Sequence, residues 1–193
     1  MSPNSTISGT APYFILGLRR TFYLDPKIID QAFRRLAAPH HPDQVSGSTS
    51  SFHELQEAAA MLRDPARRLR YLAGAPKTSS VPLPAAAMEL FPTIVAQLQF
   101  SDSLLKKYQS TQGVLAKATM IDGLVNTHHK INDILFSVQQ WQESLEQKLH
   151  ALDSASTEPS SEVLLELANS FSFAQRWHQQ LQERSLSLTT LLG

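Results

Sequence analysis

A row of apolar side chains between residues 114 and 149 is the feature that most constrains the fold. Its members recur about every 3.5 residues for almost forty residues, which is the repeat of an amphipathic α-helix. At 1.5 Å per residue, such a helix is roughly 55 Å long. The row consists of Val114, Ala118, Ile121, Val125, His128, Ile131, Leu135, Val138, Trp141, Leu145 and Leu149.

Two further rows of the same kind lie at 88–108 and 163–188, and no alternating apolar run of strand length accompanies them. Three amphipathic helices with short connections must pack mostly antiparallel. The sequence therefore predicts an all-α fold in which residues 85–193 form a C-terminal three-helix bundle. Trp141 and Trp177 are expected to face each other in its core.

Shorter helices are predicted before this bundle. Asp-Pro pairs at 25–26 and 64–65 each place a preferred N-cap residue before a proline suited to the first helical position. We expect residues 11–74 to form a separate helical domain. The Pro- and Ser-rich residues 75–84 are then expected to be a linker.

Composition excludes several functional classes. The 193 residues include no cysteine, so disulfides, thiolate zinc sites and cysteine nucleophiles are absent. The net charge is zero, with +3 over residues 1–73 and −3 over residues 74–193. A net charge of +3 is too small to indicate a nucleic-acid-binding surface, which would carry a dense basic stripe. No apolar run approaches the roughly 18 residues of a membrane span. The first residues lack the pattern of a signal peptide, so we expect a cytoplasmic protein that binds neither membrane nor nucleic acid.

The tripeptide His41-Pro42-Asp43 follows a basic helix that carries Arg34 and Arg35. Considered only as a turn, the tripeptide is suited to end a helix. Proline fixes its own φ, and the aspartate side chain can accept a hydrogen bond from a nearby backbone N–H. The position of the tripeptide between two amphipathic helices, the second followed by the Asp-Pro pair at 64–65, also suits a binding site.

These helices and their connection resemble the J-domain of DnaJ-type co-chaperones. The matching stretches are AFRRLAAPHHPD and ELQEAAAMLRDPARRLRYL. The opening PYFILGLRRTFYLD, with Phe22, Leu24 and Asp25, is similar to the HscB-type branch, as are RRLRYLAG and the late helix ANSFSFAQRWHQQLQER. HscB-type proteins are co-chaperones of iron–sulfur cluster assembly. They deliver a scaffold protein to a DnaK/HscA-type ATPase.

The resemblance implies a site that binds the chaperone and no catalytic residue in this chain. Asp43 would pair with a chaperone arginine through a charge-assisted hydrogen bond and favour ATP hydrolysis. The basic side chains of the preceding helix would steer encounter with an acidic surface. Because the partner hydrolyses the ATP, the chain itself is expected not to be an enzyme. The implied site comprises His41, Pro42, Asp43, Lys27, Arg34 and Arg35.

The resemblance also implies that the bundle binds an IscU-like iron–sulfur scaffold as client. The matching apolar positions are Met88, Phe91 and Phe173, which equally fit an ordinary bundle core. The acidic side chains expected beside them in this branch are missing. Their positions are occupied by Pro92, Val95 and Gln99.

Alternative functions remain open at this point. Gln44 in place of the usual basic residue, and Pro39 before the tripeptide, also suit an adaptor without control of an ATPase. A J-domain co-chaperone with a different client is a third possibility. His40, His41 and His53 lack a carboxylate or cysteine partner at ligand spacing, so we expect no metal and no cofactor.

Overall fold

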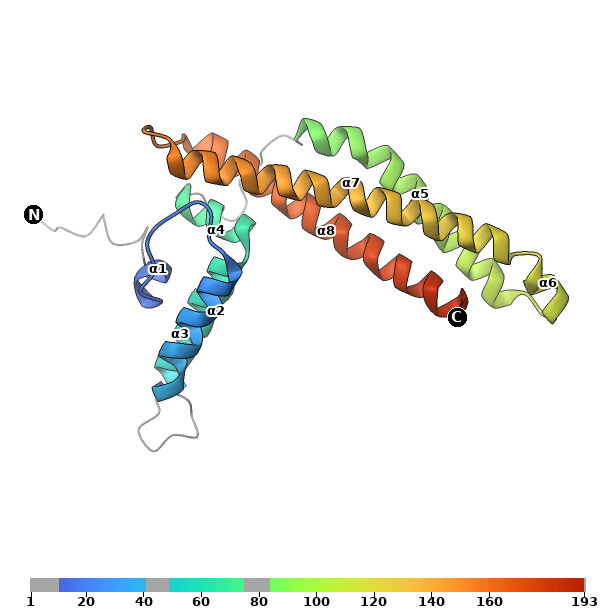
Figure 1. The fold of residues 1–193 in the computed structure, drawn as a ribbon, viewed down its shortest axis with the longest axis horizontal. Coiled ribbons are helices and arrows are strands. Elements are labelled where there is room, and N and C mark those ends of the chain that lie inside the picture. The colour runs from blue at the N-terminus through green and yellow to red at the C-terminus, as the bar shows by residue number, and fades with distance from the viewer. Residues whose placement is uncertain (1–10, 41–48, 75–83, 193) are drawn as a thin grey trace, which may run out of the picture. The chain divides into compact units, whose positions relative to one another are not determined.

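The protein is built from helices in the residues that its computed structural model describes, namely 11–40, 49–74 and 84–192, and these ranges contain no strand (Figure 1). This confirms the all-α prediction. The elements are α1 (Ala11–Ile15), α2 (Pro26–Ala37), the 3-10 turn η1 (Ala38–His40), α3 (Thr49–Arg63), α4 (Pro65–Leu72), α5 (Ala85–Ser110), α6 (Val114–Ala118), α7 (Ile121–Ser154) and α8 (Ser161–Leu192).

Two compact units make up the chain, and α7 and α8 contribute to both. The first unit combines residues 1–82 with residues 146–169, and the second combines residues 83–145 with residues 170–193. The first unit thus contains the ends of two helices that were predicted to belong to the C-terminal bundle alone. The expected division into 11–74, 75–84 and 85–193 stays a prediction.

Both Asp-Pro pairs begin helices as predicted. The Asp25 carboxylate accepts a hydrogen bond from the backbone N–H of Lys27 at 2.8 Å, and Asp64 accepts one from Arg67 at 3.1 Å. A proline follows each cap at the first helical position, where its missing N–H costs no helical bond. Local chemistry alone therefore fixes where α2 and α4 start.

Helices α2 and α3 form an antiparallel pair, seen side by side in Figure 1. Asp30 in α2 pairs with Arg63 near the end of α3, and Phe33 meets Phe52 near its start. Helix α1 packs on α3 as well. Apolar side chains from these three helices form one buried cluster. Its members are Tyr13, Leu16, Ile29, Ala32, Leu55, Ala58, Ala59 and Leu62.

The second unit is built around two tryptophans. The ring centroids of Trp141 in α7 and Trp177 in α8 lie 5.9 Å apart, which confirms the prediction that they face each other. Helix α7 runs antiparallel to α8, because His128 contacts Ser185, later in α8 than Trp177. Helix α5 runs parallel to α8, since Phe91 lies beside Trp177 and Asp102 pairs with Arg184.

The long helix predicted from residue 114 onward is interrupted, so that prediction was wrong at its start. Helix α6 ends at Ala118 and α7 begins at Ile121. Val114 and Leu115 are more than four-fifths exposed, at 87% and 82%. Helical stability in proteins comes mostly from burial of an apolar face, and these residues bury almost nothing. The Thr119 hydroxyl also donates to the Ala116 carbonyl at 2.8 Å within the break.

Ile28 and Ile29 are adjacent in α2 but differ sharply in burial. Both are apolar and suited to a core, yet Ile29 is fully buried and Ile28 is 48% exposed. At 3.6 residues per turn, neighbouring side chains diverge around the axis, so Ile28 falls at the edge of the buried face.

We expect Ile29→Ala to lower the free energy of unfolding by about 2–5 kcal/mol, because it leaves a cavity in the core. Ile28→Ala removes a half-exposed side chain and should cost less than about 1 kcal/mol. Urea denaturation of the full chain measures both. Equal losses for the two variants would contradict the assignment of Ile29 to the core.

Candidate functional site

The exposed face of α2 carries the basic side chains that were predicted to bind a partner. Lys27, Arg34 and Arg35 are all exposed. Arg34 and Arg35 lie in the last turn, where positive charge interacts favourably with the helix dipole. Asp30, on the same helix, is paired with Arg63 at 2.8 Å. The three basic side chains therefore present positive charge to solvent.

His41, Pro42 and Asp43 lie outside the described residues. The described chain leads up to them through α2 and η1, which ends at His40, and resumes at Thr49 with α3. The tripeptide thus falls in the connection between the antiparallel helices α2 and α3.

Side-chain contacts hold α2 on α3. The guanidinium of Arg63 lies 5.5 Å from the centroid of the Phe33 ring while its Nε donates to Asp30. The Phe33 ring is in turn 6.2 Å from that of Phe52. The Asp30–Arg63 pair is about two-fifths exposed on each side, so solvent screens it and its own contribution is small. The buried apolar cluster carries most of the stability of this pair of helices.

Arg68 in α4 is the largest fully buried side chain, at 2% exposure. Its Nε donates to the carbonyl of Phe22 at 3.1 Å, and its Nη1 donates to the carbonyl of Leu62. One guanidinium thereby joins α4, the end of α3 and the residues that lead into α2. In the sequence, Arg68 is one residue among others in the stretch ELQEAAAMLRDPARRLRYL, which resembles a J-domain. Four arginines lie between residues 63 and 70, and their spacing alone does not identify the buried one.

Burial lowers the pKa of the Arg68 guanidinium, because it removes water from the charged form. Negative charge on Asp64 and Asp153 opposes this lowering of the pKa. Burial also raises the pKa of Tyr13, so its hydroxyl stays protonated and donates to the carbonyl of Thr21 at 2.7 Å. Both groups are therefore hydrogen-bond donors to the backbone before α2.

The three apolar residues predicted to bind the client differ in accessibility. Met88 is 62% exposed and Phe91 is 47% exposed, whereas Phe173 is half-buried. The Phe91 and Phe173 rings lie 6.3 Å and 5.6 Å from the Trp177 ring. Trp177 thus brings two of the three together, and the exposure of Met88 and Phe91 does not match an ordinary core.

Two further histidines, His53 and His128, have local structural partners. His53 is exposed, with its Nε2 3.6 Å from a Glu57 carboxylate oxygen. His128 is half-buried, with its Nε2 3.2 Å from the Ser185 hydroxyl and 3.1 Å from that of Thr189, so it joins α7 to α8. Within the parts of the chain that are described, no group of three His, Cys, Asp or Glu residues is arranged to hold a metal. Nor is any helix there long and apolar enough to cross a bilayer.

Comparison with known proteins identifies the N-terminal helices. The DnaJ domain family matches residues 11–71. The Chaperone protein DnaJ of Hyphomonas neptunium is 42% identical over 62 residues, that of Caulobacter vibrioides is also 42% identical over 62, and that of Methanosarcina thermophila is 41% identical over 61. Each alignment covers 31% of this chain, and 15–16% of the relative.

A DnaJ-type J-domain is therefore present at the N-terminus, followed by a helical C-terminal region. The chain spans about a sixth of the length of the curated relatives that it matches. The family match at residues 11–71 includes α2, which carries Lys27, Arg34 and Arg35, and the connection that contains His41, Pro42 and Asp43.

Proposed function

We propose that this chain is a J-type co-chaperone that stimulates ATP hydrolysis by a DnaK-type chaperone. The single observation that carries the proposal is a J-domain at residues 11–71 whose second helix exposes Lys27, Arg34 and Arg35. His41-Pro42-Asp43 occupies the connection after that helix. The cytoplasm is the proposed site of action.

The proposed mechanism requires no bond to be made or broken by this chain. The basic face of α2 attracts an acidic chaperone surface, which raises the association rate more than the affinity. Asp43 then pairs with an arginine of the chaperone, and this charge-assisted hydrogen bond favours the hydrolysing state. Pro42 restricts the backbone next to that carboxylate, so less conformational freedom is lost on docking.

We expect His41→Gln to abolish stimulation of the chaperone ATPase while leaving the chain folded. The substitution removes one side chain of the proposed contact. The measurement is the steady-state ATPase rate of a DnaK-type chaperone with increasing amounts of the full chain.

His53→Gln is the matched control, because His53 is an exposed histidine in α3. It should stimulate hydrolysis like the unaltered chain. Stimulation that survives His41→Gln would contradict the proposed mechanism. Binding to the chaperone without any stimulation by the unaltered chain would instead favour the adaptor function.

We further propose that the client is an IscU-like iron–sulfur scaffold, as in HscB-type co-chaperones. Support comes from the HscB-like sequence pattern, from the exposure of Met88 and from that of Phe91, whose ring lies beside Trp177. The acidic side chains typical of this branch are replaced by an exposed Pro92, a half-buried Val95 and an exposed Gln99. Binding would therefore rely on apolar contact more than on charge, and would depend weakly on salt.

The double substitution Met88→Ala/Phe91→Ala should weaken scaffold binding at least tenfold, since exposed apolar anchors dominate such interfaces. Phe136→Ala is the control, because Phe136 is another exposed phenylalanine, on α7. Titration calorimetry with an IscU-like scaffold measures both affinities. No detectable binding by the unaltered chain would favour a co-chaperone with another client.

A further inference from the structure

The residues that join α1 to α2 are held by α4 on one side. We name residues 18–24 the linking segment. Its Thr21 carbonyl accepts from the Tyr13 hydroxyl at 2.7 Å, and its Phe22 carbonyl accepts from the buried Arg68 guanidinium at 3.1 Å. These contacts lie within the matched J-domain residues. They satisfy carbonyl groups of the linking segment but leave the N–H groups of Phe22 and Tyr23 to be paired elsewhere.

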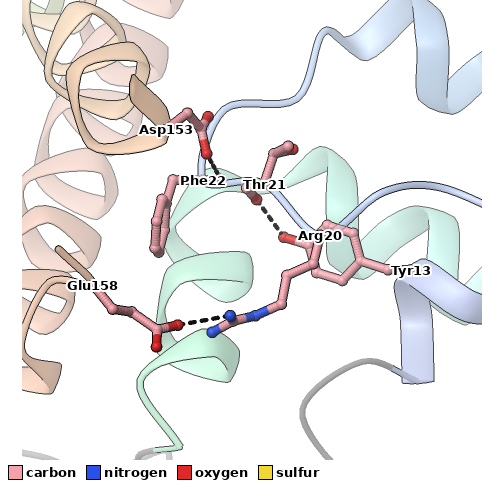
Figure 2. Close-up of polar contacts among 6 residues, drawn as sticks. All are labelled: Tyr13, Arg20, Thr21, Phe22, Asp153 and Glu158. Carbon is pink, nitrogen blue, oxygen red and sulfur yellow. Dashed lines mark hydrogen bonds and ion pairs between the residues drawn. The ribbon is translucent and has the colours of Figure 1, made fainter. Parts of the chain in front are cut away.

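The carboxylate of Asp153, near the end of α7, accepts hydrogen bonds from those N–H groups. One oxygen is 2.7 Å from the backbone nitrogen of Phe22, and the other is 2.8 Å from that of Tyr23. Figure 2 shows Asp153 pointing from its helix toward the linking segment. A charged acceptor shared by two backbone donors forms stronger bonds than a neutral acceptor would.

The backbone at Phe22 is thus held from two sides, by a buried cation at its carbonyl and by an anion at its N–H. The negative charge of Asp153 also interacts favourably with the Arg68 guanidinium. A buried cation is costly without compensating negative charge. Asp153 is therefore bonded to Phe22, 131 positions away in the sequence, and Phe22 is bonded in turn to Arg68.

Three more contacts connect the same parts of the chain. The Tyr23 ring lies 3.7 Å from that of His150, Arg20 pairs with Glu158 at 2.7 Å, and Arg70 donates to the Asn169 side chain at 3.0 Å. Figure 2 shows the Arg20 side chain extended toward Glu158. We name residues 146–169 the hairpin end. All of these contacts fall inside the first compact unit, to which the hairpin end belongs.

We infer that the hairpin end completes the J-domain of this chain, so that residues distant in sequence fold as one discontinuous unit closed by Asp153. Asp153 acts as a positioning residue. It fixes the linking segment, which is followed immediately by Asp25, the cap that starts α2. The inference rests on these contacts and is independent of the proposed chaperone partner.

We expect Asp153→Ala in the full chain to increase the exchange rates of the Phe22 and Tyr23 amides at least tenfold, because both lose their acceptor. The amides of Ile29 and Ala32, within α2, should also lose protection if the hairpin end completes the unit. Hydrogen exchange followed by NMR measures all four. Asp133→Ala is the matched control, since Asp133 is an exposed aspartate in the same helix.

Unchanged exchange at Phe22 and Tyr23 would overturn the inference, as would equal acceleration by the control. Acceleration confined to those two amides, with Ile29 and Ala32 unaffected, would also overturn it, because the contact would then be local. If Asp153→Ala does not fold, Asp153→Asn decides, with Asp133→Asn as its control. Faster exchange at the four amides in Asp153→Asn alone supports the inference, and no difference overturns it.

Discussion

The hydrogen bonds of the buried Arg68 guanidinium hold together the helices that support the exposed face of α2. It donates to carbonyls at the end of α3 and in the linking segment before α2, while its own backbone belongs to α4. Removing it would take the donor from the carbonyls of the buried Leu62 and the half-buried Phe22. The Asp25 cap sets where α2 starts, and this cation holds the segment that leads into that cap.

Local signals in the sequence predict the ends and faces of most helices. The caps at Asp25 and Asp64 depend on neighbouring residues only, so the sequence alone is enough to predict them. The pairing of Trp141 with Trp177 follows from helical period and short connections, which leave few ways to bury both rings. The exposure of Lys27, Arg34 and Arg35 follows from the same period in α2.

Features set by long-range contacts were missed for a physical reason. The Arg68–Phe22 bond joins residues 46 positions apart, and the Asp153 bonds span 130 and 131. An apolar period reports which face of a helix is buried, but not which polar group meets a distant backbone. The break after α6 was missed because Val114 continues the apolar row without being buried.

Exchange protection of α2 after replacement of Arg68 tests the central claim most directly. Arg68→Met should destabilise the first unit by at least about 2 kcal/mol, because the carbonyls of the buried Leu62 and the half-buried Phe22 lose their donor. This loss corresponds to about thirty-fold faster exchange of the buried α2 amides. Arg67→Met, the exposed neighbour in the same helix, should leave α2 protection unchanged. Equal protection of α2 in the two variants would contradict the account.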